Sequence, residues 1–232
     1  IPVDDKMITN MGVGGLLKEI SLRPRPRIIE SLRGSKKIDI LLLAAGQSSR
    51  MKGKDKLLLE KNGKSLLELS TNECLKVGAN KVHVILGDNY KSRMKVLKNL
   101  DVNFCIFKGY KEGMGSSIAY GMQLIKPDVD AVIVALADMP KIKKNFFVQL
   151  IEGFDINKKN EICRFFSMSN KAGHPTLFGK RFFEDLRALK GETGAKYLIE
   201  NRKDYLHKII CKDESPIYDI DTPEDFLDWF NN

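Results

Sequence analysis

Apolar and polar positions along this chain change their spacing near residue 38, which predicts where the folded domain begins. From there, short and nearly continuous apolar runs alternate with stretches whose apolar residues recur every three or four positions. The continuous runs predict buried strands at 38–43, 82–86, 102–107 and 131–136. The periodic stretches predict amphipathic helices at 65–77, 89–98 and 116–125. Strands that are apolar on both faces and separated by helices indicate a mainly parallel sheet covered on both sides.

The second half of the chain continues with shorter elements and one turn-linked pair of strands. Strands at 161–168 and 174–178 flank the polar turn 169–173, a pattern that predicts a hairpin added to the main sheet. The remaining predicted elements are helices at 181–189 and 193–201, strands at 206–211 and 217–220, and a closing helix at 223–230.

Residues 1–37 differ in character from the rest of the chain. Pro24 and Pro26 stand in an arginine-rich run, and proline fits neither a helix interior nor a central strand. We therefore interpret 1–37 as an extended linker or the tail of an upstream domain, followed by one α/β domain at 38–232.

Composition narrows the class of protein. With 43% hydrophobic and 30% charged residues, the chain suits an ordinary soluble domain, and its apolar runs are too short to cross a bilayer. The net charge of +9 comes from scattered basic residues without a nucleic-acid-binding motif. A general bias of composition is the first explanation of this charge, small phosphate-bearing ligands are the second and nucleic acid is the third, so we expect neither nucleic acid nor a membrane as a partner. The four cysteines form no CxxC pair, which favours reduced, buried thiols in a cytoplasmic protein and argues against a zinc site.

The segment after the first predicted strand carries the strongest sign of chemistry. Small residues in a loop let backbone N–H groups approach an anion and leave room for a flat base. The candidates for contact with a nucleotide are Leu43, Ala44, Ala45, Gly46 and Ser48. Arg50 and Lys56 add two cations suited to phosphates. Open parallel sheets bind ligands at the carboxyl ends of their strands, so a nucleotide site is predicted here, although the loop matches neither a P-loop nor GxGxxG.

Two acidic residues follow predicted strands at the same edge of the sheet. Asp138 comes after the run 131–136, and Asp221 ends the run 217–220. Carboxylates from separate strand ends that meet a triphosphate would hold Mg²⁺, or Mn²⁺ in its place, for phosphoryl or nucleotidyl transfer. The alternative is a turn or a helix cap, and capping accounts for part of the acidity of Asp219, Asp221 and Asp225 before the last helix.

Two further segments contain glycine and are candidates for ligand contact. Gly115 belongs to a turn before the helix that begins at Ser116, whose amino end would direct partial positive charge at an anion or base edge of the nucleotide. A plain glycine turn is the alternative. Gly173, His174 and Pro175 begin a strand, and they either serve the structure or contact the acceptor or the nucleotide.

These five segments, in this order and spacing, resemble the MobA-like NTP transferase family, and above all its molybdenum cofactor cytidylyltransferases. The similarity runs from about Ile38 to Phe230. Leu43–Gly46 reads LAAG, which is common in cytidylyl-transferring members, whereas guanylyl-transferring members typically have LAGG. Gly173–Pro175 and Gly191–Lys196 also resemble the corresponding segments of the cytidylyl-transferring members. The resemblance implies a Rossmann-like three-layer nucleotidyltransferase fold with a mainly parallel, twisted sheet.

The resemblance also implies an activity, the attachment of CMP from CTP to the phosphate of molybdopterin with release of pyrophosphate. It implies that Ala44–Gly46 contact cytosine and ribose and that Arg50 and Lys56 hold the triphosphate. These two cations would act in catalysis together with Asp138, and Asp138 and Asp221 would bind Mg²⁺.

The expected partners are CTP and molybdopterin or the molybdenum cofactor, with a molybdoenzyme or its chaperone as a further partner. Residues 11–27 resemble the connector that follows an upstream molybdopterin-binding domain in two-domain proteins. Three alternatives stay open. The first is a transferase of the same fold that uses GTP or a sugar phosphate. The second is a non-catalytic nucleotide- or cofactor-binding chaperone module, and the third is a nucleic-acid binder that uses the basic residues.

Overall fold

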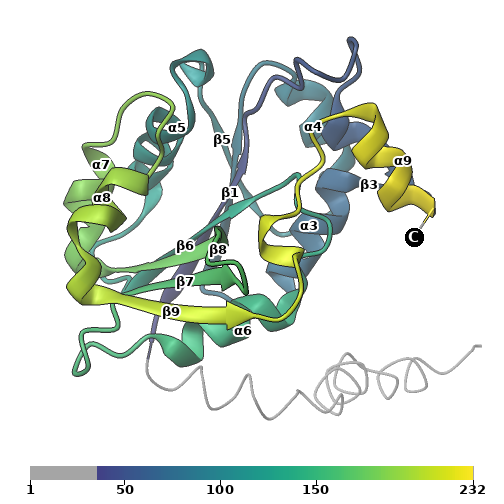
Figure 1. Ribbon diagram of the computed structural model, residues 1–232. Helices are drawn as coiled ribbons and strands as arrows, with labels where there is room; N and C mark the ends of the chain where they lie inside the picture. Colours follow the sequence, from purple (N-terminus) through teal and green to yellow (C-terminus); the bar gives the residue numbers. More distant parts are fainter. Residues whose placement is uncertain (1–35, 232) are drawn as a thin grey trace, which may run out of the picture. The chain divides into compact units, whose positions relative to one another are not determined.

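A seven-stranded sheet runs through the part of the chain that the computed structural model describes, residues 36–231 (Figure 1). Its strands follow the order β5-β4-β1-β6-β8-β7-β9. Their bounds are β1 Ile38–Ala44, β4 Lys81–Leu86, β5 Asn103–Ile106, β6 Ala131–Leu136, β7 Ile162–Ser167, β8 Ala172–Gly179 and β9 Leu206–Cys211. A separate small hairpin pairs β2 Glu60–Lys61 with β3 Lys64–Ser65.

The parallel centre of the sheet follows from the sequences of its strands. Every residue of β1, IDILLLA, is buried, and β1 pairs in parallel with β4 on one side and with β6 on the other. Strands that are apolar on both faces need cover on both faces. β8 runs antiparallel to both β6 and β7, while β9 runs parallel to β7. The predicted mainly parallel sheet with an added hairpin is therefore confirmed.

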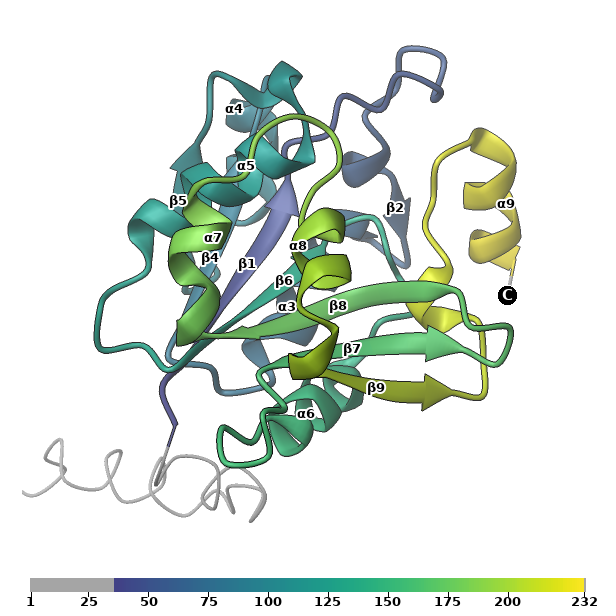
Figure 2. The ribbon, with the colours of Figure 1, turned by 60° about the vertical axis from the view of Figure 1, so that its left-hand side comes forward.

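Helices on both faces of the sheet complete three layers (Figures 1 and 2). One face carries α3 Leu66–Leu75, α4 Tyr90–Val96 and α6 Lys144–Gly153, and the other carries α5 Met114–Gly121, α7 Phe183–Arg187 and α8 Lys196–Asn201. Successive side chains of a strand point to opposite faces. Leu41 and Leu43 accordingly pack with Ile118 of α5 and Leu186 of α7, whereas Leu42 faces residues of α3 and α6.

Short 3-10 helices occupy many of the connections. They are η2 Lys56–Leu58, η3 Tyr110–Glu112, η4 Met122–Leu124, η5 Lys180–Phe182, η6 Lys203–Tyr205 and η7 Ser215–Ile217, and the last element is α9 Pro223–Asn231. Within residues 36–231, no helix has both the length and the apolar character needed to cross a membrane.

Several elements differ from the sequence prediction, among them the hairpin of β2 and β3, which was not predicted. Helix α6 was not predicted, although Phe147 and Leu150 form its buried side. The strand predicted at 217–220 is wrong. Residue 217 ends η7, which has Pro216, a residue without an N–H donor, in its first turn, and residues 218–220 form no regular element. Beyond η7, the N–H of Ile220 donates to the carbonyl of Asp138 (3.0 Å). This bond places the segment before α9 against the end of β6.

The linker predicted at 1–37 lies outside the described residues except for its last two. Nζ of Lys36 donates to the carbonyl of Phe154 (2.6 Å), and Nζ of Lys37 pairs with Asp128 at 2.6 Å. Both lysines therefore lie against the α/β domain.

Candidate active site

The loop after β1 forms one wall of a cleft at the carboxyl ends of the parallel strands. The cleft has a volume of about 310 Å³. Four of the residues predicted to contact a nucleotide line it, and they are Leu43, Ala45, Gly46 and Asp138. Tyr110, Met114, Leu136 and Glu192 line other parts of it. We call this the nucleotide cleft below.

A buried arginine on α4 fixes the loop from behind. Arg93 is 3% exposed, and its guanidinium donates to the carbonyls of Ala44 (2.6 Å) and Gly46 (2.9 Å). Its Nε lies 2.9 Å from the carboxylate of Asp55, which also accepts from Asn89 (2.7 Å). A planar fork of donors matches carbonyl and carboxylate acceptors in this way. Sequence analysis missed Arg93 because nothing in the helix pattern distinguishes it from the neighbouring basic residues.

Predicted residue Ser48 also supports the loop instead of lining the cleft. Its hydroxyl accepts a hydrogen bond from the N–H of Lys56 (3.2 Å), which ties the loop to the start of η2. Asp55 caps the same 3-10 helix by accepting from the N–H of Leu57 (3.0 Å). The loop therefore has a defined path between β1 and η2.

The start of α5 forms the opposite wall of the nucleotide cleft. Gly113 has a φ of 106°, and a Cβ there would lie 2.7 Å from the carbonyl of Gly191, so only glycine fits. The N–H of Gly115 donates to the carbonyl of Gly191 (2.7 Å). The N–H of Gly191 in turn donates to the hydroxyl of Ser116 (3.2 Å). These two predicted residues thus hold the segment that carries Glu192, which lines the cleft.

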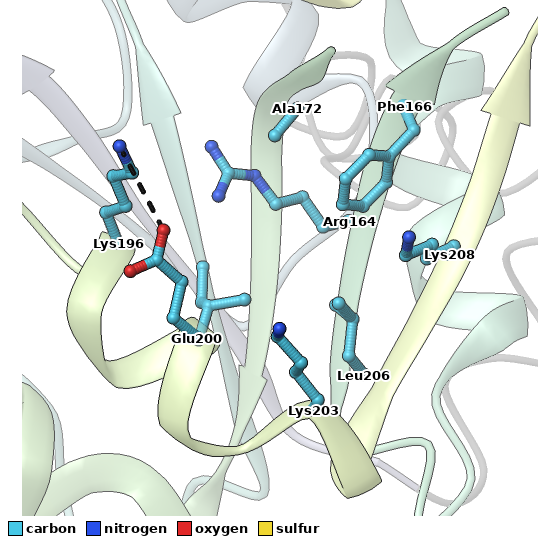
Figure 3. Close-up of a pocket in the computed structure, with 9 residues that line it drawn as sticks. Arg164, Phe166, Ala172, Lys196, Glu200, Lys203, Leu206 and Lys208 are labelled. Atoms are coloured by element: carbon cyan, nitrogen blue, oxygen red, sulfur yellow. Dashed lines mark ion pairs between the residues drawn. The ribbon is translucent and has the colours of Figure 1, made fainter. Parts of the chain in front are cut away.

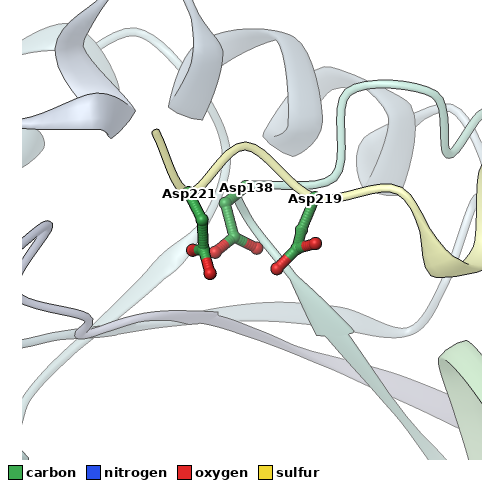
Figure 4. A group of neighbouring side chains, drawn as sticks. All are labelled: Asp138, Asp219 and Asp221. Carbon is green, nitrogen blue, oxygen red and sulfur yellow. The ribbon is translucent and has the colours of Figure 1, made fainter. Parts of the chain in front are cut away.

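Three carboxylates meet beside the nucleotide cleft (Figure 4). Asp138 follows β6, Asp219 and Asp221 precede α9, and an oxygen of each lies within 4.8 Å of the others. The sequence predicted Asp138 and Asp221 as metal ligands, and the structure brings them together. Asp219 was considered only as part of a helix cap. Side chains two residues apart in an extended segment point to the same face, so the spacing of Asp219 and Asp221 could have indicated Asp219 as a third ligand.

Lys56 and Arg50 neutralise part of this negative charge. Nζ of Lys56 lies 2.7 Å from Oδ2 of Asp138 and 2.8 Å from Oδ1 of Asp221. Nη1 of Arg50 lies 2.7 Å from Oδ2 of Asp221. The side chain of Lys56 is 9% exposed and that of Arg50 is 71% exposed, so the first contact belongs to the interior and the second to the surface. Both predicted phosphate-binding cations therefore meet the carboxylates.

The electrostatics of this group favour a divalent cation. Burial by itself would lower the pKa of Lys56, but Asp138 and Asp221 outweigh it and raise that pKa, so the lysine stays cationic. Loss of hydration and repulsion from Asp221 and Asp138 raise the pKa of Asp219. Oδ1 of Asp138 is buried and has no hydrogen-bond partner within residues 36–231. The three carboxylates outnumber the two cations, and the buried Oδ1 of Asp138 has no other partner among the described residues. These oxygens therefore form a donor set that fits Mg²⁺ or Mn²⁺.

Asp225 has a separate role as the cap of α9. Its Oδ2 accepts from the N–H of Asp221 (3.0 Å) and from the N–H and hydroxyl of Thr222 (2.8 Å each). The hydroxyl of Thr222 in turn accepts from the N–H of Asp225 (3.2 Å), which completes a reciprocal cap. Loss of hydration opposes these hydrogen bonds, but together they lower the pKa of Asp225. The helix-cap interpretation therefore holds for Asp225.

The predicted acceptor residues Gly173, His174 and Pro175 do not line the nucleotide cleft. A Cβ at Gly173 would lie 2.3 Å from the carbonyl oxygen of Pro216, so close packing requires the glycine. Burial and the positive charge of Arg164 lower the pKa of His174 to about 4. Its Nδ1 is buried and without a partner in the described part of the chain. An acceptor role for these residues stays a prediction.

A parallel sheet with a small-residue loop at the end of its first strand, and with carboxylates and cations gathered beside that loop, defines a nucleotide-binding α/β domain of the nucleotidyltransferase class. Comparison with known proteins agrees with this class. The sequence profile of the MobA-like NTP transferase domain matches residues 40–207, and the chain belongs to this family.

Two curated relatives are 24% and 26% identical to this chain over the aligned residues. The bifunctional protein GlmU of Marinobacter nauticus is 26% identical over 168 residues, which cover 72% of this chain and 34% of that protein. The chain thus matches about a third of that relative's length. The nicotine blue oxidoreductase of Paenarthrobacter nicotinovorans is 24% identical over 189 residues, covering 79% of this chain and 92% of that protein.

Solved structures share the fold. Rv0371c from Mycobacterium tuberculosis H37Rv has a TM-score of 0.75 at 20% identity and covers 85% of this chain and 99% of that chain. The structure of its complex with manganese has a TM-score of 0.71 at 18% identity and covers 85% of this chain and 100% of that chain. A CMP:2-keto-3-deoxy-manno-octonic acid synthetase complexed with CTP has a TM-score of 0.68 at 14% identity and covers 85% of this chain and 98% of that chain.

Proposed function

We propose that this protein joins CMP from CTP to the phosphate of molybdopterin and releases pyrophosphate. One observation carries the proposal: Asp138, Asp219 and Asp221 meet Lys56 at the edge of the nucleotide cleft. A fixed group of opposite charges at this position can stabilise a triphosphate while its α-phosphorus is attacked. The family supplies the class of reaction, and the identity of the acceptor belongs to the proposal.

The loop sequence and one structural neighbour support CTP as the nucleotide. Leu43–Gly46 reads LAAG, the form that resembles cytidylyl-transferring members. A Cβ added at Gly46 would meet open space, so a ligand can approach the backbone there. Leu136 and Met114 give the cleft apolar walls suited to a flat base. The octonic acid synthetase, which shares the fold, was solved with CTP.

Mg²⁺ is the proposed metal, with Mn²⁺ as a substitute. Asp138, Asp219 and Asp221 would hold it, since hard divalent cations prefer carboxylate oxygens. When bound, such an ion neutralises negative charge on the phosphates and makes the α-phosphorus a better electrophile. The manganese complex of the structural neighbour Rv0371c supports a divalent metal in this fold.

Lys56 and Arg50 have the proposed task of positioning the triphosphate. Lys56 is held in the interior as a cation, so its charge is directed at the reacting phosphates without reorganisation. Arg50 can exchange Asp221 for a phosphate because exposed ion pairs are weak. An oxygen of the acceptor phosphate forms the new bond to the α-phosphorus, and the bond to pyrophosphate breaks. The attacking phosphate is already an anion at neutral pH, so no protein nucleophile is required.

The proposal is tested by incubating the protein with molybdopterin, Mg²⁺ and one NTP at a time, followed by mass spectrometry of the products. We expect a cytosine dinucleotide and pyrophosphate with CTP and neither product with GTP. A guanine dinucleotide would show that GTP, and not CTP, is the nucleotide. A product formed with a sugar 1-phosphate would show that the acceptor is not molybdopterin. Tight nucleotide binding without pyrophosphate release under any condition would overturn the proposal in favour of a binding module.

A further inference from the structure

A second cleft, distinct from the nucleotide cleft, lies between the strands β7, β8 and β9 and the helix α8 (Figure 3). Its volume is about 740 Å³. Phe166 of β7 and Leu206 of β9 give it an apolar floor. Cations surround that floor, and they are Arg164, Lys196, Lys203 and Lys208. We call this the cationic cleft.

The positive charge of the cationic cleft is largely uncompensated. Among the described residues, Glu200 is the one acidic residue that lines it, and its carboxylate lies 4.0 Å from Nζ of Lys196. No ion pair joins Arg164, Lys203 or Lys208 to a carboxylate anywhere in residues 36–231. A concave surface with an excess of one charge concentrates ligands of the opposite charge. The cationic cleft therefore suits an anion.

Arg164 is the cation best placed to anchor such an anion. Its Nε donates to the carbonyl of Gly173 (2.9 Å), which fixes the side chain, and Figure 3 shows the guanidinium reaching toward the side of the cleft where Lys196 lies. Burial lowers the pKa of Arg164, a sign that its guanidinium is poorly hydrated. A charged group that is already stripped of water and held in place binds an anion more strongly than a mobile surface lysine does.

The cationic cleft and the nucleotide cleft open on the same face of the sheet. Ile162 of β7 packs in one core with Leu43 and Ile118, so alternation along β7 puts Arg164 and Phe166 on that face as well. Glu192 lines the nucleotide cleft, and Lys196, four residues later at the start of α8, lines the cationic cleft. The segment 192–196 thus runs from one cleft to the other.

We infer that the cationic cleft binds the acceptor substrate, an organic anion whose flat or apolar body rests on Phe166 and Leu206 while Arg164 holds a negative group remote from the attacking oxygen. This inference rests on the proposed function, because it assumes that a second substrate reaches the α-phosphorus in the nucleotide cleft. It assigns acceptor selection to β7–β9 and α8, and nucleotide selection to the loop after β1.

A binding experiment tests the cationic cleft directly with pterin-6-carboxylate, a flat fluorescent anion, as the probe. We expect Arg164→Gln to weaken binding of the probe by about tenfold or more, as the loss of a charged hydrogen bond does. Lys203→Gln combined with Lys208→Gln changes two exposed residues, so it should weaken binding without affecting folding. Lys81→Gln is the matched control, since Lys81 is an exposed cation at the amino end of β4, away from both clefts. Equal affinity in all of these variants would overturn the inference.

A kinetic experiment separates this inference from the proposed function. With molybdopterin and CTP, the variants of the cationic cleft should raise KM for the acceptor by about tenfold and leave KM for CTP within about twofold, because each cleft holds one substrate. If the variants lose probe binding and no dinucleotide forms with the unmodified protein, the anion site in the cationic cleft stands, whereas its role as the acceptor site fails together with the proposed function. If dinucleotide forms at the same acceptor KM in every variant, the proposed function stands and the inference fails.

Discussion

The ammonium nitrogen of Lys56 lies 2.7 Å from Oδ2 of Asp138, in a setting that leaves 9% of the lysine side chain exposed. Asp221 accepts from the same nitrogen at 2.8 Å, so one cation joins the end of β6 to the segment before α9. Buried charges are tolerated when they are paired, and removing one partner is costly. The pairing therefore makes the chemistry of the site and its stability depend on the same residues.

Asp138→Asn should lower kcat by about a hundredfold to several thousandfold, because losing a metal ligand removes several kcal/mol of transition-state stabilisation. Pyrophosphate release with CTP and Mg²⁺ measures the effect. Asp101→Asn is the control, since Asp101 is an exposed carboxylate just before β5 and should leave turnover unchanged. Near-normal turnover of Asp138→Asn would remove this residue from the mechanism.

Mg²⁺ or Mn²⁺ should raise the melting temperature through the cluster of Asp138, Asp219 and Asp221. At about 100 times Kd a ligand adds about 2.7 kcal/mol to the free energy of unfolding, which for a chain of this size is a shift of roughly 5–10 °C. Asp219→Asn should reduce the shift, because it removes one of the three carboxylates. If the metal raised the melting temperature of Asp138→Asn and Asp219→Asn as much as that of the unmodified protein, the bound ion would lie elsewhere.

Arg93→Met should lower the free energy of unfolding by about 3–5 kcal/mol, because the carboxylate of Asp55 and two loop carbonyls would lose their buried partner. Urea denaturation measures the change. Lys95→Met, at an exposed position of the same helix, should change stability little. Asp55→Asn combined with Arg93→Met should cost less than the sum of the single changes, since the two side chains interact. Strict additivity would contradict this coupling.

Gly173→Ala and Gly46→Ala should have opposite effects. At Gly173 the new Cβ would lie 2.3 Å from a backbone oxygen of Pro216, so stability should fall by about 1–3 kcal/mol or more. At Gly46 the Cβ meets open space in the nucleotide cleft, so stability should persist while KM for the nucleotide rises. Denaturation and steady-state kinetics of both variants check the pair. A rise in nucleotide KM for Gly173→Ala alone would reverse the two assignments.

Acidification should destabilise the protein through His174. Its pKa is lowered from 6.5 to about 4 in the folded state, so the unfolded state binds more protons between these values. The stabilising contribution is complete above about pH 6.5 and is lost as pH falls toward about 4, by up to about 3 kcal/mol. Urea denaturation at several pH values measures the slope. His174→Gln should flatten it over this window, and an unchanged slope would assign the acid sensitivity to other groups.

The pattern of the sequence by itself determined the parallel centre of the sheet. Continuous apolar runs at 38–43 and 131–136 correspond closely to β1 and β6, because strands buried on both faces leave this local mark. The same pattern predicted that the loop after β1 and Asp138 emerge at one edge, since parallel neighbours end together. The cap at Asp225 also follows from local sequence, because its partner Thr222 is three residues away.

Only the tertiary structure decided which distant side chains meet. The contact of Lys56 with Asp221, the support of the loop by Arg93 and the gathering of cations around Phe166 each join elements far apart in the chain. No periodicity encodes such contacts, because they depend on how the strands and helices are ordered and packed. The false strand at 217–220 shows the same limit. The N–H of Ile220 donates to the carbonyl of Asp138, just after β6, but a strand requires a neighbouring strand with which it pairs along its length.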